Sequence, residues 1–240
     1  MSQRAHSDIR SLLLYGSSAR GDSETASDVD LLGIVSAGPP RLFENGAIRL
    51  NIYSVETLRQ LVSLGSLFTW HLRTEGRIIF DPETLLETIL SGFNLRDDYS
   101  IERLDATRLG RCVVERSITP ATDSLLRRTA VYCLRTVLYS KLAEEGVPKF
   151  SRDAVVEHFQ DASIAWLWDL KHRTPIQRTD LHALSLFLDQ YGQQTESTSH
   201  ELSEFAQLRL NQIDRALETG LEVGYEGIDL MGMGVPGKRK

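Results

Sequence analysis

The stretch Leu12–Val35 restricts the possible folds of this 240-residue chain more than any other segment. It begins with the apolar run LLLY, which predicts a buried strand, and continues through a Gly16-Ser17 turn and ten small or polar residues. Asp28-Val29-Asp30 then leads into a second apolar run. Because side chains alternate along a strand, Asp28 and Asp30 are expected on one face, about 7 Å apart. Such a pair suits a divalent metal ion, and the small residues upstream allow backbone N–H groups to approach a phosphate.

Gly16-Ser17, ten residues and Asp28-x-Asp30 together resemble the GSx10DxD signature of the nucleotidyltransferase superfamily, which has the fold of DNA polymerase β. The local sequences GSSARG and SDVDL are most similar to its minimal and kanamycin-nucleotidyltransferase-like bacterial branches. A lone Asp-x-Asp is weak, but one at a set distance after a strand and a Gly-Ser turn is hard to obtain by accident. An ordinary hairpin with a polar loop is the alternative interpretation.

The resemblance implies an enzyme that moves NMP from an NTP to an acceptor hydroxyl and releases pyrophosphate. The nucleotide is expected to be ATP, with Mg²⁺ or Mn²⁺ as the cofactor. Asp28 and Asp30 would be the metal ligands and the catalytic residues, because a metal ion offsets the charge that builds up on phosphate oxygens. The acceptor could be a small molecule, a protein or an RNA.

The resemblance also assigns nucleotide-binding roles around this carboxylate pair. Gly16 would let the triphosphate approach closely, and Ser17 would offer its hydroxyl and N–H to the phosphates from a short helical turn over Ser17–Gly21. Arg20 would reach a phosphate, or would instead form a surface salt bridge with Asp22 or Glu24. Ser27 would orient the start of the strand. The full set of expected nucleotide-binding residues is Gly16, Ser17, Arg20, Ser27 and Asn51.

One departure from the family pattern concerns a third carboxylate, which the resemblance places on the strand beside Asp28-x-Asp30. The matching strand is expected at Ala47–Tyr53, with one apolar face and one outward polar face. The apolar face consists of Ile48, Leu50 and Ile52, and the outward face consists of Arg49, Asn51 and Tyr53. No Asp or Glu lies on it, and Asn51 offers only one neutral oxygen to a metal ion.

Three explanations of this departure stay open. A carboxylate from the helical half could act as the base, as the kanamycin-nucleotidyltransferase-like resemblance implies, with Glu102, Asp105 and Glu115 as candidates and an exposed surface position as the alternative for each. The site could instead be complete only with a partner or substrate. Finally, the protein could bind a nucleotide without catalysis.

The first hundred residues predict a small mixed sheet with flanking helices. Besides the strands of Leu12–Val35, strands are expected at Ala47–Tyr53, after an Asn45-Gly46 hairpin turn, and at Arg77–Phe80. Ser54 is expected to cap one helix, Gly76 to end a second, and Pro82 to occupy the first position of a third.

From Asp98 onward, helical periodicity dominates the sequence. Helices are expected at Ser100–Ser117, Ala121–Glu145, Arg152–His172, Arg178–Tyr191 and Ser197–Thr219. The fold class is therefore predicted as α+β, with a mixed-sheet nucleotidyltransferase domain over residues 1–97 and an α-helical bundle domain over 98–221. The Gly-rich segment 222–240 is expected to be a loosely ordered tail.

Composition limits the partners and the compartment. The net charge of −6 argues against a general DNA-coating protein, although a local patch could still bind RNA or a nucleotide. No apolar run is long enough for a membrane span, and no signal peptide is evident, so a cytoplasmic protein is expected. Cys112 and Cys133 are not spaced as a metal site or a disulfide framework. A homodimer or a protein partner is possible from the apolar helical surfaces.

Other clusters have a functional and a structural interpretation. Phe68, Trp70 and His71 could contact a nucleobase or belong to the core. Trp166 and Trp168 suit a core or an interface. The arginines of the first bundle helix could attract phosphate or RNA, or form a solvated face balanced by acidic neighbours. These arginines are Arg103, Arg108, Arg111 and Arg116.

Two further functions compete with the nucleotidyltransferase. A degenerate nucleotidyltransferase fold could serve as a nucleotide sensor, or as a subunit of a toxin–antitoxin or defence-type complex, and the missing third carboxylate favours this alternative. Arg152 and His158 also match the Arg-x4–6-His spacing of HEPN ribonucleases, although such spacing arises by chance in a chain with this many arginines.

Overall fold

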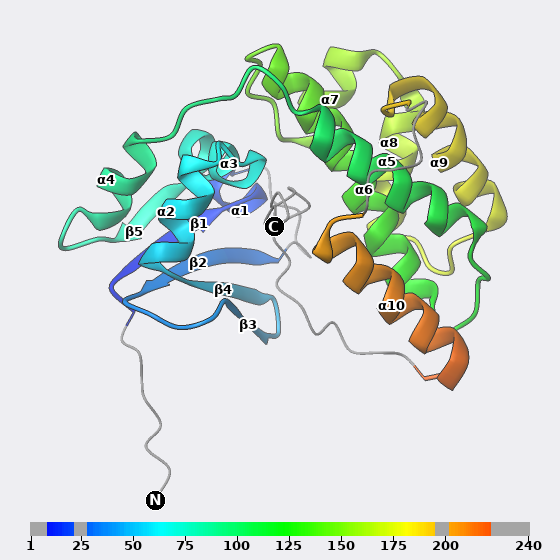
Figure 1. The fold of residues 1–240 in the computed structure, drawn as a ribbon, viewed down its shortest axis with the longest axis horizontal. Coiled ribbons are helices and arrows are strands. Elements are labelled where there is room, and N and C mark those ends of the chain that lie inside the picture. The colour runs from blue at the N-terminus through cyan, green and yellow to red at the C-terminus, as the bar shows by residue number, and fades with distance from the viewer. Residues whose placement is uncertain (1–8, 22–27, 195–201, 222–240) are drawn as a thin grey trace, which may run out of the picture. The chain divides into compact units, whose positions relative to one another are not determined.

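The computed structural model describes residues 9–21, 28–194 and 202–221. The chain divides into two compact units, and the boundary between them in the sequence lies between Leu95 and Arg96. The first unit contains a five-stranded sheet with helices, and the second contains helices only (Figure 1). The predicted α+β class is confirmed. Ser27 and the tail 222–240 lie outside the described residues. No described helix is sufficiently long and apolar to cross a membrane.

The sheet of the first unit is mixed, with the strand order β3-β4-β2-β1-β5. Strand β1 is antiparallel to β2 and β5, whereas β4 is parallel to β2 and antiparallel to β3. The strands are β1 (Ser11–Tyr15), β2 (Val29–Val35), β3 (Arg41–Asn45), β4 (Ile48–Ser54) and β5 (Arg77–Phe80). Gly46, at φ +59°, turns β3 into β4, so the predicted hairpin turn is confirmed. Strand β3 itself was not predicted, because its exposed sequence RLFEN lacks a clear alternation.

Capping residues set the helices of this unit. The Ser54 hydroxyl accepts the N–H of Thr57 at the start of α2 (Val55–Ser63), and Gly76 follows α3 (Leu67–Glu75), both as predicted. Helix α4 (Leu85–Ser91) begins later than the prediction from Pro82. The Asp81 carboxylate accepts hydrogen bonds from the N–H groups of Leu85 and Leu86, each with an N–O distance of 2.9 Å. These two bonds fix the start of α4.

Helix α3 identifies which face of the sheet is covered. The Phe68 ring lies edge-on to Tyr15 of β1 and Tyr53 of β4, with ring centroids 5.8 Å and 5.9 Å apart. Asn51 and Tyr53 are fully buried, whereas Ile48 is 45% exposed. The prediction that Arg49, Asn51 and Tyr53 face outward is therefore wrong. Alternation alone does not say which face packs on helices, and here two polar aromatic groups and an amide lie inward.

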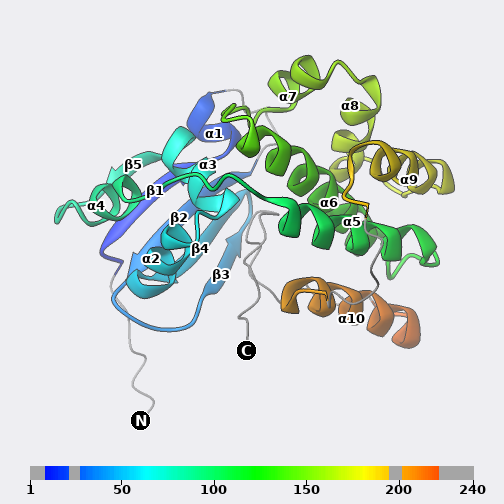
Figure 2. The same ribbon diagram turned by 45° about the horizontal axis from the view of Figure 1, so that its top comes forward.

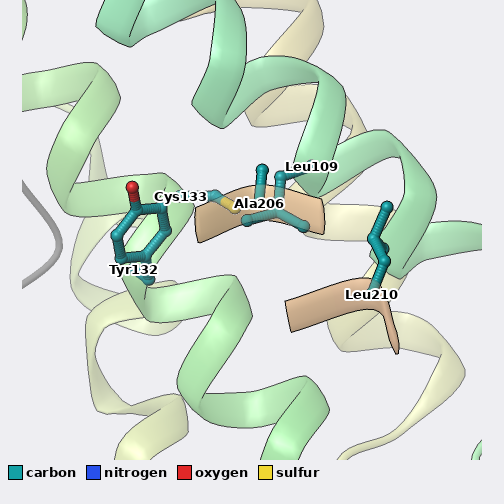
Figure 3. Close-up of a cluster of buried hydrophobic side chains, with 5 residues drawn as sticks. All are labelled: Leu109, Tyr132, Cys133, Ala206 and Leu210. Atoms are coloured by element: carbon teal, nitrogen blue, oxygen red, sulfur yellow. The ribbon is translucent and has the colours of Figure 1, made fainter. Parts of the chain in front are cut away.

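The second unit is built around one long buried helix, α6, which contacts α5, α8, α9 and α10. Its helices are α5 (Ser100–Glu115), α6 (Asp123–Glu144), α7 (Arg152–Phe159), α8 (Ala162–Trp168), a 3-10 turn (Asp169–Lys171), α9 (Arg178–Tyr191) and α10 (Glu204–Thr219). Helix α10 packs on α5 and α6 (Figure 2). The contact includes the buried cluster Leu109, Tyr132, Cys133, Ala206 and Leu210 (Figure 3).

The predicted continuous helix Arg152–His172 is wrong. Gln160 adopts the left-handed conformation at φ +52° and ends α7. The Asp161 carboxylate then accepts the N–H of Ser163 at 2.8 Å and starts α8. A non-glycine residue at positive φ is rare, so sequence periodicity gives little warning of this break.

Candidate active site

The Gly-Ser turn and the carboxylate of Asp30 lie against each other. Gly16 has φ +73° and ψ −157°, a backbone conformation that is essentially restricted to glycine. A Cβ atom on Gly16 would lie 2.9 Å from Oδ2 of Asp30, closer than any side chain tolerates. The two halves of the Gly-Ser and Asp-x-Asp pattern, separated in sequence, therefore lie side by side.

Strand pairing explains this contact. Tyr15, the last residue of β1, is opposite Asp30 of β2, and the turn that follows Tyr15 brings Gly16 beside the carboxylate. On its other side, Asp30 is paired with Arg49 of β4. Paired residues place their side chains on the same face, so Tyr15, Asp30 and Arg49 form one row across the sheet. Arg49 also bonds Glu44 of β3 through Nε at 2.9 Å.

The short helix α1 (Ser17–Arg20) follows the turn, as predicted. The carbonyl oxygen of Gly16 accepts the N–H groups of Ala19 and Arg20, and the predicted glycine Gly21 ends the helix in the left-handed conformation. The N–H groups of Ser17 and Ser18 start the helix and have no partner within it. The Ser18 hydroxyl donates to the backbone oxygen of Asp28 at 3.3 Å, which ties α1 to the start of β2.

Asp28 and Asp30 differ in their surroundings. Asp28 directly precedes β2 and is exposed, whereas Asp30 lies within β2 and is partly buried. The sequence predicted a strand from Asp28, one residue earlier than observed. Within the described ranges 9–21, 28–194 and 202–221, no three His, Cys, Asp or Glu side chains are grouped to hold a metal ion.

Arg20 has a partner that the sequence did not suggest. Its Nη1 lies 2.5 Å from Oε2 of Glu75 on α3, and the same oxygen lies 2.8 Å from Nε2 of His71. Asp22 and Glu24, the predicted surface partners, lie outside the described residues. Glu75 is 55 residues from Arg20 in the chain, so no local pattern could have indicated the pair.

Asn51 belongs to the core of the sheet unit. Its side-chain nitrogen donates to the hydroxyl of Tyr15 at 2.7 Å, and the residue has no exposed surface. Its Oδ1 atom is buried and has no hydrogen-bond partner among the described residues. Asn51 pairs with Leu32, two residues beyond Asp30, so it lies further inside the sheet than the carboxylates. The structure thus places it away from the exposed position of Asp28.

The three carboxylates predicted as candidate bases in the helical unit, Glu102, Asp105 and Glu115, differ in burial and in their partners. Asp105 is buried and accepts both the N–H of Ser203 at 2.8 Å and its hydroxyl at 2.6 Å. Glu102 is buried and paired with Arg96, and its burial raises its pKa although the cation opposes the shift. An exposed surface position is wrong for both residues. Only Glu115 is exposed, as that alternative predicted.

The remaining predicted clusters serve the fold. Phe68, Trp70 and His71 are buried, which agrees with the core interpretation. Trp168 is also buried, whereas Trp166 is 52% exposed beneath the guanidinium of Arg173.

Three of the four arginines predicted on the first bundle helix pair with acidic residues of other helices. Arg103 and Arg111 of α5 pair with Glu144 and Asp189, and Arg116, directly after α5, pairs with Asp214. These partners differ from the predicted ones on α5 itself. The proposed ribonuclease residues are also engaged separately, since Arg152 pairs with Asp169 and His158 with Glu145.

Comparison with known proteins found similarity to solved structures alone. No protein-family model matches the chain, and no curated protein matches its sequence. Among solved structures, the chain is similar to a nucleotidyltransferase-like protein from Exiguobacterium sibiricum, with 16% identity and a TM-score of 0.31. The match covers 78% of this chain and 69% of that chain. A similarity of this size does not identify the residues of a site.

Proposed function

We propose that this chain is a metal-dependent nucleotidyltransferase that moves NMP from an NTP to an acceptor hydroxyl. One observation supports the proposal above all others: the Asp30 carboxylate lies so close to Gly16 that a side chain at position 16 would collide with it. It brings a turn suited to phosphate and a carboxylate suited to a divalent ion into one place. A hairpin with a purely structural polar loop would not require a glycine-only conformation against a carboxylate.

The residues present fit a magnesium ion. Asp28 and Asp30 offer hard oxygen ligands, and the missing Cβ of Gly16 leaves room beside Asp30. In this proposal Asp28 and Asp30 hold the ion, whose charge would offset the negative charge that develops on the phosphate oxygens. Two carboxylates leave most of the coordination to water and to phosphate oxygens, which is the usual arrangement for magnesium with a nucleotide.

The residues of the turn bind and orient the nucleotide. The N–H groups of Ser17 and Ser18 have no partner within α1 and can donate to phosphate oxygens. The Ser17 hydroxyl adds a further donor, and Arg20 adds a positive charge. The acceptor is a hydroxyl compound, and ATP is the expected donor of the nucleotidyl group.

A second candidate function is nucleotide binding without transfer. The observation that favours it is the pairing of Asp30 with Arg49, because a cation lies on the neighbouring strand where the family resemblance implies a third carboxylate. A cation on the strand next to Asp30 disfavours a second positive charge, such as a metal ion, at that carboxylate. In this alternative the protein is a nucleotide sensor, or a subunit of a toxin–antitoxin or defence-type complex.

Radiolabel transfer tests both candidates. The protein is incubated with each α-³²P-labelled NTP, with Mg²⁺ or Mn²⁺, and with a cell extract as the source of acceptors, while NTP binding is measured separately by calorimetry. We expect label on an acceptor, and a loss of about a thousandfold in the double variant Asp28→Asn/Asp30→Asn, because the metal ligands are removed. Glu56→Gln, an exposed carboxylate on α2, is the matched control and should transfer label as the wild type does.

The outcomes separate the two candidates. Transfer that persists in the double variant contradicts the assigned metal ligands. Metal-dependent NTP binding with no label on any acceptor favours the sensor. If the wild type binds no NTP at all, both candidates are wrong.

A further inference from the structure

A chain of polar contacts connects helix α3 to the turn at Gly16-Ser17 and the helix α1 that follows it, to which the proposed function assigns the nucleotide phosphates. Oε2 of Glu75 lies 2.5 Å from Nη1 of Arg20 and 2.8 Å from Nε2 of His71. The exposed fractions of the three side chains are 21% for Arg20, 12% for Glu75 and 4% for His71. The ion pair of Arg20 and Glu75 is therefore largely removed from water, and a charge-assisted hydrogen bond in such surroundings is strong and directional.

A second contact joins α3 to the same turn. The imidazole of His71 lies edge-on to the ring of Tyr15, with centroids 6.1 Å apart and planes at 87°. Tyr15 directly precedes Gly16, and Arg20 lies at the end of the helix that the turn begins. Glu75 is thus linked to both ends of the turn, through Arg20 at one end and through His71 and Tyr15 at the other.

Fixing an arginine in advance makes it a better ligand for phosphate. A guanidinium has five N–H donors in a rigid plane, so it can bind a carboxylate and a phosphate together. A free arginine side chain loses conformational freedom when it binds, and a carboxylate that already holds it removes part of this cost. The pair of Arg10 and Glu83 is a contrast, because its side chains are 33% and 61% exposed and water competes with the bond between them.

We propose that Glu75 and His71 are positioning residues that hold Arg20 in place for the phosphate groups of the nucleotide. Glu75 acts directly on the guanidinium, and His71 fixes the carboxylate by its bond to the same oxygen. Neither residue contacts the substrate. The inference rests on the proposed function, because it requires a nucleotide phosphate at the turn.

A double-mutant cycle on nucleotide affinity tests the proposal. Calorimetry with ATP and Mg²⁺ is carried out on the wild type, Arg20→Ala, Glu75→Gln and the double variant. Each single change should weaken ATP binding about tenfold, and the double variant should bind no more weakly than Arg20→Ala, because Glu75 acts only through Arg20. Adenosine, which lacks phosphate, should bind all four proteins equally. Glu83→Gln is the matched control, and its ATP affinity should equal that of the wild type.

His71→Gln provides an independent test if Glu75→Gln does not fold. It should weaken ATP binding several-fold, and this effect should also vanish in the Arg20→Ala background. A purely structural role predicts a lower thermal unfolding temperature with unchanged ATP affinity, and that result overturns the proposal. Effects of Glu75→Gln and Arg20→Ala that add fully overturn it as well. A wild type that binds no ATP contradicts the proposed function itself, whereas wild-type binding with unaffected variants contradicts only the role of Glu75 and His71.

Discussion

The two units of this chain use their carboxylates in different ways. In the helical unit, Asp105, Asp123 and Asp180 are buried, and each accepts hydrogen bonds from elements distant in sequence. At the sheet, Asp28 is exposed, and the described residues offer its carboxylate no hydrogen bond. A buried carboxylate with several donors is committed to the fold, because losing a partner leaves a desolvated charge. An exposed carboxylate without such bonds is available to a ligand.

Asp123 illustrates the structural use most fully. Its two oxygens accept from the backbone N–H of Ile176 at 2.6 Å, from Thr174 and from Arg127 on its own helix. This set of bonds holds the segment before α9 against the start of α6. Among the residues that the structure describes, nothing comparable encloses Asp28. We therefore expect substitutions at the Gly16 turn to change ligand affinity, and substitutions at the buried carboxylates to change the free energy of unfolding.

The largest expected effect follows from Gly16→Ala. The added Cβ would meet Oδ2 of Asp30 at 2.9 Å in a conformation that only glycine adopts readily. We expect ATP affinity to fall about a hundredfold and the free energy of unfolding to fall by about 2–3 kcal/mol. Calorimetry and urea denaturation measure the two quantities.

Gly21→Ala is the matched control for this prediction. Gly21 also has a positive φ, +82°, but a Cβ there would meet no atom within 4 Å. It should lose about 1 kcal/mol of stability and keep its ATP affinity. Equal losses of affinity in the two variants would show that backbone strain alone, and not contact with Asp30, explains the role of Gly16.

A smaller effect, confined to stability, is expected for Asp105→Asn. Asp105 accepts two bonds from Ser203, the residue that caps α10, and an amide cannot accept both as a carboxylate does. We expect the free energy of unfolding to fall by about 2 kcal/mol, with ATP affinity unchanged. The exposed Glu115→Gln on the same helix should alter neither quantity. A loss of ATP affinity in Asp105→Asn would contradict the division of roles between the two units.

The smallest effect concerns pH and Tyr191. Burial and a hydrogen bond to Asp161, with the two side-chain oxygens 3.0 Å apart, raise the pKa of Tyr191 to about 12. A tyrosine in an unfolded chain has a pKa of about 10, so the folded state holds this proton more tightly. The stabilisation is fully present below pH 10 and is lost as the pH rises towards 12.

Tyr191→Phe isolates this contribution. At pH 8 the variant should be less stable than the wild type by about 1 kcal/mol, and the gap should narrow between pH 10 and pH 12. Urea denaturation of both proteins at several pH values measures this difference in the free energy of unfolding. The contributions of all other titratable groups cancel in the difference, because the two proteins share those groups. A gap that stays constant over this range would contradict the assigned bond.

The local features of the fold were accessible from the sequence. The apolar runs before Gly16 and after Asp28 predicted β1 and β2, and Ser54 predicted the start of α2, because strand alternation and helix capping depend on near neighbours. The turn at Gly16 was predicted from near neighbours as well, because Gly16 directly follows the apolar run and precedes Ser17. Two features were missed for different reasons. The inward face of β4 depends on packing against the distant Phe68 of α3. The late start of α4 depends on the Asp81 carboxylate, only four residues before Leu85, and apolar periodicity does not indicate such a side-chain bond.

The spacing of Gly16, Ser17, Asp28 and Asp30 was enough to group them in one candidate site, because it fits a strand, a turn and a second strand. The neighbours of these residues became known from the three-dimensional structure. Strand pairing placed Arg49 beside Asp30, and the packing of α3 brought Glu75 to Arg20. Both neighbours are specified by long-range packing, in which the hydrophobic faces of strands and helices choose their partners, and a linear pattern does not carry that choice.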